Sequence, residues 1–235
     1  YSYSGNYYSA GLTDSEATTS FASGEIVDTF SYTNGTQLAA FSGSNGWSGA
    51  WSGDTGSFTN HAGSFGAQTN YPTPSGNKLW VHSPDNESRY VLRAFSAKTS
   101  GKVYAAYILN YQWDGASKWS GASLMHGATE KIFFGECGGG SSNLGVHTTV
   151  DDKILFPGSG NDYVVVMRYD FATDDAHASA YKIGTDAVPL DEPSAWDAEY
   201  LNVGGITQID GISLRVGSTA GRPGDVYFDE VRVAT

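Results

Sequence analysis

The chain has 235 residues, of which 40% are hydrophobic and 16% are charged, and it contains 30 glycines and 15 tyrosines. This composition supplies a core, favours strands and turns over helices, and fits one large all-β domain. The formal net charge of −12 disfavours nucleic acid and anionic membranes as partners, and no apolar run is long enough to insert into a membrane.

Residues 1–24 form a Tyr- and Ser-rich tail that differs from the rest of the chain. Its first residues alternate aromatic and small side chains, which is typical of a strand. Because chain ends are ordered only when they are docked, we expect the tail to lie on its own domain or on another copy. The tyrosines that would make these contacts are Tyr1, Tyr3, Tyr7 and Tyr8. The start at Tyr1 without Met favours a mature protein that is secreted or held at the cell surface.

Residues 25–235 show a strand pattern interrupted by Gly, Asn, Asp or Pro about every ten residues. Several strands alternate strictly, which predicts an antiparallel sandwich with one face of each sheet buried. The predicted strands are Ile26 to Tyr32, Lys78 to His82, Tyr90 to Ala97, Val103 to Tyr111, Lys131 to Gly135, Leu144 to Val150, Tyr163 to Phe171, Ala178 to Ile183, Gly211 to Val216 and Val226 to Val233. Only Glu192 to Tyr200 indicates a helical turn.

Two long stretches, Ser42 to Ser75 and Gln112 to Thr129, lack a strand pattern and hold most of the tryptophans. Long loops on a rigid sandwich commonly carry binding sites. An exposed indole there could stack on a sugar or anchor another protein, which makes candidates of Trp47, Trp51, Trp113 and Trp119. For Trp47 and Trp51 we favour the alternative that they fill the core, so Trp113 and Trp119 are the more open candidates.

The single cysteine, Cys137, lies in a glycine-rich segment and excludes an internal disulfide. The favoured interpretation is an inert thiol. The alternative is a bond to another chain, which an unpaired cysteine in an exported protein permits.

The last strand contains apolar residues that fall out of step, because Val226 and Phe228 would face opposite to Val231 and Val233 under strict alternation. All four can reach one core only if a β-bulge inserts an extra residue near Asp229 and Glu230. The sequence therefore predicts a bulge that turns both carboxylates away from the core.

Six segments carry a family resemblance through their order along the chain. They are Asp28 to Tyr32, Gly46 to Trp51, Lys131 to Gly135, Val164 to Phe171, Asp210 to Gly217 and Phe228 to Val233. In this order they resemble the concanavalin A-like, laminin-G-like jelly-roll domains of bacterial secreted and surface proteins. The resemblance covers about residues 25–235, predicts an antiparallel two-sheet β-sandwich, and implies a non-catalytic module.

The resemblance also places the first and last strands side by side, so that acidic residues from both could meet. Hard oxygen ligands suit calcium, and the candidate ligands are Asp28, Asp229 and Glu230. The alternative is a solvated acidic edge or an Asp that caps a turn.

Catalytic patterns are absent from the sequence. Jelly-roll glycanases need two carboxylates on one face, and no strand shows an acidic pair at the required spacing. The five histidines are scattered without ligand spacing. We therefore predict that the chain is not an enzyme and needs no cofactor other than calcium.

Two functions remain for an extracellular sandwich of this kind. The first is a structural or adhesive subunit that contacts copies of itself or other extracellular proteins, with the tail adding a strand to a neighbour. The alternative is a lectin-like module that binds polysaccharide through loop tryptophans and calcium. The sequence slightly favours the first, because the tail and the unpaired cysteine have a ready role there.

Overall fold

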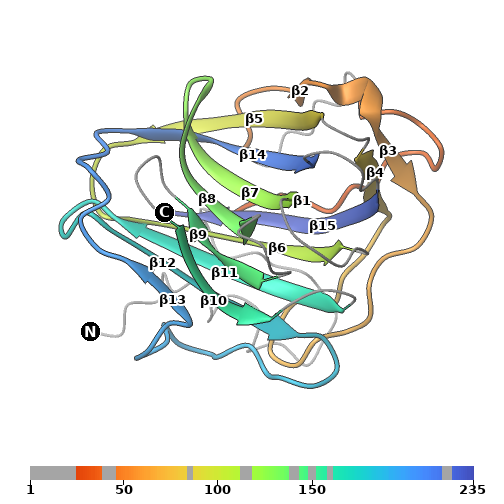
Figure 1. Ribbon diagram of the computed structural model, residues 1–235. Coiled ribbons are helices and arrows are strands. Elements are labelled where there is room, and N and C mark those ends of the chain that lie inside the picture. The colour runs from red at the N-terminus through yellow and green to blue at the C-terminus, as the bar shows by residue number, and fades with distance from the viewer. Residues whose placement is uncertain are drawn as a thin grey trace.

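The computed structural model describes residues 25–38, 46–83, 87–111, 118–137, 143–147, 152–157, 161–218 and 224–235. Over these ranges the chain forms two antiparallel sheets packed face to face (Figure 1). The predicted all-β, two-sheet antiparallel sandwich is confirmed. No helix in the described ranges is long and apolar enough to cross a membrane.

Sheet 1, as we call the first sheet, has eight strands and contains both ends of the sandwich domain. Its order is β13-β12-β11-β6-β15-β4-β3, and β1 also pairs with β15. The strands are β1 (Ile26–Asp28), β3 (Phe58–His61), β4 (Lys78–Ser83), β6 (Lys102–Tyr111), β11 (Asp162–Asp170), β12 (Asp175–Lys182), β13 (Ala198–Tyr200) and β15 (Gly224–Ala234). The predicted pairing of the first and last strands is confirmed, with Ile26 opposite Val233.

Sheet 2 has seven strands in the order β10-β9-β8-β7-β14-β5-β2. The strands are β2 (Ser52–Gly53), β5 (Ser88–Lys98), β7 (Lys118–His126), β8 (Thr129–Cys137), β9 (Asn143–His147), β10 (Asp152–Pro157) and β14 (Ile209–Ser218). A short 3-10 turn, Thr55–Ser57, precedes β3.

Two apolar clusters follow from the alternation of side chains. The larger lies between the sheets and includes Ile212, Leu214 and Val216 of β14. The smaller lies on the outer face of sheet 1, where Tyr71 and Val188 from two long connections pack against strand residues. Segments 62–77 and 183–197 therefore cover part of that outer face.

The predicted bulge in β15 is present. The register with β6 shifts between Asp229 and Arg232, and Glu230 has a left-handed φ of 49°. As a result Val226, Phe228, Val231 and Val233 all belong to the larger cluster.

Three local predictions are wrong. The stretch Gln112 to Thr129, predicted to be irregular, contains the central strand β7, and Ser42 to Ser75 contains β3. Glu192 to Tyr200 forms no helical turn and ends in the short strand β13. In β7 the small residues Gly121 and Ser123 hide the alternation, because only Ala122 and Leu124 mark the buried face.

Candidate functional site

The outer face of sheet 2 carries a group of partly exposed side chains of different chemical types. Because Ile212, Leu214 and Val216 point inward, Arg215 points outward from β14. Its cross-strand partner on β7 is Gly121. On the same face lie Trp119 and Ser123 of β7, and Phe133 and Glu130 of β8.

Arg215 connects these side chains. Its Nη1 lies 3.1 Å from Oε1 of Glu130, and its guanidinium lies 5.6 Å from the ring centroid of Trp119. The Ser123 hydroxyl donates to Oε2 of Glu130 at 2.6 Å. The ring of Trp119 meets Phe133 edge to face at 5.3 Å. These contacts fix the rotamers of an aromatic ring, a cation and a carboxylate at one place.

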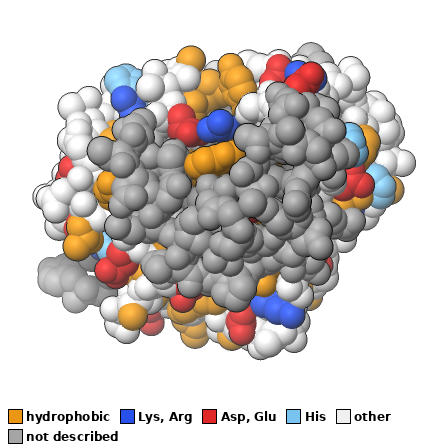
Figure 2. Space-filling model, viewed as in Figure 1, with side chains coloured by type: hydrophobic (Ala, Val, Ile, Leu, Met, Phe, Trp, Pro, Cys, Tyr) orange, Lys and Arg blue, Asp and Glu red, His pale blue; other side chains and the backbone are white. Residues whose placement is uncertain are grey.

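The charged side chains of this group are partly accessible to solvent. The side chains of Arg215 and Glu130 are 31% and 29% exposed, whereas Ser123 and Phe133 beneath them are buried. Figure 2 shows basic, acidic and hydrophobic side chains next to one another over the region of β7, β8 and β14. We call Trp119, Arg215, Glu130 and Ser123 the sheet 2 site.

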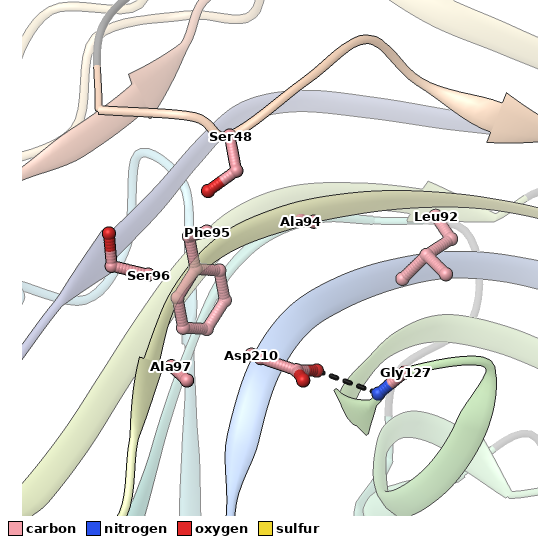
Figure 3. A pocket seen from close by; sticks show the side chains of 8 residues that line it. All are labelled: Ser48, Leu92, Ala94, Phe95, Ser96, Ala97, Gly127 and Asp210. Atoms are coloured by element: carbon pink, nitrogen blue, oxygen red, sulfur yellow. Dashed lines mark hydrogen bonds between the residues drawn. The ribbon is translucent and has the colours of Figure 1, made fainter.

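A depression of about 390 Å³ lies farther along the same face (Figure 3). Its lining is Ser48, Leu92, Ala94, Phe95, Ser96, Ala97, Gly127 and Asp210. Asp210 accepts a hydrogen bond from the Gly127 amide at 2.7 Å and another from Gln208 at 2.7 Å. Small side chains on β5 leave the space open, and Asp210 supplies a carboxylate at its edge.

The register brings this depression close to the sheet 2 site. Met125 pairs with Gly211 on one side and with Glu130 on the other, and Asp210 precedes Gly211 in the chain. Two carboxylates from different strands therefore lie on one face of sheet 2. A ligand with an apolar face and several hydroxyl groups could stack on Trp119 and exchange hydrogen bonds with these groups.

The predicted metal ligands do not form one group in the structure. Asp28 faces the interior, where it accepts hydrogen bonds from Trp51 Nε1 at 2.8 Å and Tyr32 at 2.7 Å and pairs with Arg93. The described residues contain no group of three or more His, Cys, Asp or Glu side chains placed to hold a metal.

Asp229 and Glu230 instead point to the outer face of sheet 1, beneath segment 62–77. Asp229 accepts a hydrogen bond from Ser64, and Glu230 pairs with Arg232 at 2.7 Å. Both are fully buried, which contradicts the alternative of a solvated acidic edge. Burial raises the pKa of Asp229 to about 8, against the opposing hydrogen bond from Ser64.

The other predicted contact residues are distributed as follows. Trp47 and Trp51 are buried at 8% and 3% exposure and cannot contact a ligand. Trp119 lies on the outer face of sheet 2 as the first outward residue of a strand. Trp113, Tyr1, Tyr3, Tyr7 and Tyr8 lie outside the described residues. Cys137 ends β8, and its side chain also lies outside what the structure describes.

Sequence reasoning missed Arg215 and Glu130 as site residues. Arg215 was recognisable, because it alternates with the buried residues of β14. Glu130 sits at the start of β8, beyond the predicted strand, and only the pairing of β7 with β8 brings it to Ser123 and Arg215.

No family model matches the sequence, and no curated protein matches it. Among solved structures, the catalytic domain of a glycoside hydrolase family 131 protein from Coprinopsis cinerea superposes with a TM-score of 0.51 at 11% identity, covering 87% of this chain and 84% of that one. Lectin UEA-II complexed with galactose gives 0.47 at 8% identity, covering 89% and 97%. The fold is a concanavalin A-like jelly roll. A sialidase gives 0.49 at 10% identity over 76% of this chain, which spans only 17% of the sialidase.

The match to the Coprinopsis cinerea domain confirms the predicted resemblance in fold and corrects the prediction about catalysis. The prediction that the chain is not an enzyme is contradicted to this extent: the fold that it adopts also occurs in a catalytic domain. The same architecture, over most of both chains, forms the catalytic domain of a glycoside hydrolase. The sequence argument required both carboxylates on one strand or across one bulge, whereas here Glu130 and Asp210 come from different strands.

Proposed function

We propose that this chain binds carbohydrate at the sheet 2 site. The supporting observation is the fixed contact of Trp119 with Arg215 and of Arg215 with Glu130 on a partly exposed strand surface. An indole face attracts the apolar C–H face of a sugar ring, while the guanidinium and carboxylate exchange hydrogen bonds with its hydroxyls.

The charge of the molecule narrows the ligand class. At a net charge of −12 the protein repels polyanions at long range. Within the site, the charge of Arg215 is balanced by Glu130. A neutral polysaccharide fits these conditions better than a sulfated or uronate-rich one.

The test is isothermal titration of a panel of neutral oligosaccharides against the intact protein and Trp119→Ala. Loss of the stacking face should raise Kd about tenfold, which corresponds to about 1.4 kcal/mol. Trp196→Ala is the matched control, because Trp196 also lies 5.6 Å from an arginine, Arg168, but packs over the outer face of sheet 1. Equal affinities for Trp119→Ala and wild type would rule out this site.

Glycoside hydrolysis is the second candidate function. It is favoured by the two carboxylates on the face of sheet 2 and by the fold shared with a glycoside hydrolase catalytic domain. Hydrolysis of this type uses two carboxyl groups that flank the scissile bond. Release of reducing ends from neutral polysaccharides should then fall at least a hundredfold in both Glu130→Gln and Asp210→Asn. Activity that persists in both variants would exclude these residues as the catalytic pair.

The partner would then be a polysaccharide, and the protein would act at an extracellular location, where such glycans are found. The role of calcium, and self-assembly through the tail, stay predictions from the sequence.

A further inference from the structure

We infer a second carbohydrate-binding site on the opposite side of the sandwich, formed by an aromatic platform on the outer face of sheet 1. The platform consists of Trp80 of β4, Tyr227 of β15, His61 of β3 and Lys78 of β4. It shares no residue with the sheet 2 site, and it lies beside the part of sheet 1 that segment 62–77 covers.

The strand register builds the platform. Trp80 pairs directly with Tyr227 on one side and with Thr59 on the other, so their side chains share one face. The intervening residues Leu79 and Phe228 are buried in the larger apolar cluster, which forces Trp80 and Tyr227 outward. Neither ring belongs to an apolar cluster, and both are partly exposed.

Neighbouring side chains hold the rings in place. The Lys78 ammonium lies 4.8 Å from the ring centroid of Tyr227, and the His61 ring meets Tyr227 edge to face at 5.8 Å. The rings of Trp80 and His82 are 6.4 Å apart. A surface whose rings are already fixed loses little rotamer entropy when a ligand stacks on it.

Hydrogen-bonding groups border the rings. His82 Nδ1 lies 2.9 Å from Asp225, and these two side chains are 51% and 39% exposed. Figure 2 shows histidine, acidic and hydrophobic side chains together at the right-hand edge, where β3 and β4 lie in Figure 1.

Asn110 supplies a second, independent observation. It lies on β6 directly opposite Tyr227, on the other side of β15 from Trp80, and is only 9% exposed. Its amide nitrogen donates to Asp162, but its Oδ1 accepts no hydrogen bond within the described residues. A buried acceptor without a donor is costly, so binding that uncovers Oδ1 to a ligand hydroxyl next to Tyr227 would recover that free energy.

These features select a neutral carbohydrate as the occupant. Aromatic faces next to hydroxyl acceptors match a sugar, which has an apolar face and a polar rim. The two carboxylates of Asp225 and Asp162 beside the platform outweigh the single charge of Lys78, which disfavours an anion. A stable protein interface buries about 800 Å² on each partner, far more than four side chains provide, so a protein partner fits less well.

The experiment measures binding of cellohexaose and xylohexaose by isothermal titration to the intact protein. The variant Trp119→Ala isolates the platform, because it removes the sheet 2 stacking face. In that background Trp80→Ala and Tyr227→Ala should each weaken the remaining binding about tenfold, and Trp80→Phe should weaken it less. Trp196→Ala in the same background should have no effect. Thermal unfolding of each variant verifies that it is folded.

The outcomes separate this inference from the proposed function. If Trp119→Ala alone abolishes binding and Trp80→Ala alone leaves it unchanged, the platform is not a site and the sheet 2 proposal stands. If Trp80→Ala abolishes binding and Trp119→Ala does not affect it, the platform stands and the sheet 2 proposal fails. If the wild type binds neither probe, both proposals are overturned. If the protein self-associates in a way that requires Trp80, the choice of a carbohydrate as the ligand of the platform is overturned.

Discussion

At the scale of single residues, Arg93 shows how a charged side chain can belong to the core. It is 1% exposed, pairs with the carboxylate of Asp28, and lies 4.8 Å and 5.7 Å from the rings of Trp47 and Trp51. The ion pair between Arg93 and Asp28 joins β5 of sheet 2 to β1 of sheet 1. Trp47 and Trp51 are therefore parts of a structural cluster, which explains why they are unavailable to a ligand.

Replacing Arg93 by Met should destabilise the fold by about 3–5 kcal/mol, because Asp28 is left buried without its counter-charge. Arg89→Met is the matched control, since Arg89 pairs with Glu87 at the surface, where such a pair contributes about 0–1 kcal/mol. Urea unfolding of both variants measures the difference. Similar losses in the two variants would show that the buried pair is not the determinant.

Asp229 makes the stability of the fold depend on pH. Burial raises its pKa to about 8 in the folded protein, so between about pH 4 and pH 8 the folded state keeps a proton that the unfolded state has released. The contribution of Asp229 to the free energy of unfolding is therefore most favourable at low pH and decreases as pH rises through this window. We expect the melting temperature to fall by at least about 5 °C from pH 5 to pH 9 because of Asp229.

The variant Asp229→Asn should remove this part of the pH dependence and raise the melting temperature at pH 9 relative to wild type. Asp225→Asn, at a partly exposed position of the same strand, is the control and should leave the slope unchanged. A slope that is identical in wild type and Asp229→Asn would contradict a buried, protonated Asp229.

At the scale of elements, glycines set the spacing of β7 and β8. A Cβ at Gly121 would lie 2.1 Å from the carbonyl oxygen of Phe134 and 2.8 Å from Cα of Gly135, so the two backbones must separate to admit it. Gly121→Ala should therefore lower the free energy of unfolding by about 1–3 kcal/mol or more. It should also displace Arg215, which pairs with Gly121 across β14 and β7.

Gly49→Ala is the control for this prediction, because a Cβ there meets nothing within 4 Å. Chemical denaturation should show a loss only for Gly121→Ala, and titration with an oligosaccharide should show weaker binding. Unchanged stability in Gly121→Ala would mean that β7 and β8 can separate at no cost.

A structural feature could be predicted from the sequence where the residues of a single strand determine it. The bulge in β15 is visible because Val226, Phe228, Val231 and Val233 can share a core in only one way. The site was less visible, because Glu130 and Arg215 meet only through the register of three strands. The burial of Asp229 depends on segment 62–77, and no local pattern reveals that this loop folds back over β15.

At the scale of the whole molecule, the sandwich separates its two candidate surfaces. The sheet 2 site faces outward from one sheet and the aromatic platform from the other, and the large apolar cluster lies between them. One glycan segment cannot reach both surfaces directly. Each molecule can instead hold two chains, or two distant parts of one chain, and the combined binding gains from the second contact.

Wild-type protein should therefore cross-link a long neutral polysaccharide such as xyloglucan, which light scattering detects as growth of particle size. Trp119→Ala and Trp80→Ala should each still bind but no longer cross-link, because each retains one surface. Excess of a competing hexasaccharide that is too short to join two molecules should reverse the growth. Scattering by the protein alone must stay constant, since self-association would mimic the effect. If either single variant cross-links as strongly as wild type, the two surfaces do not act as a pair.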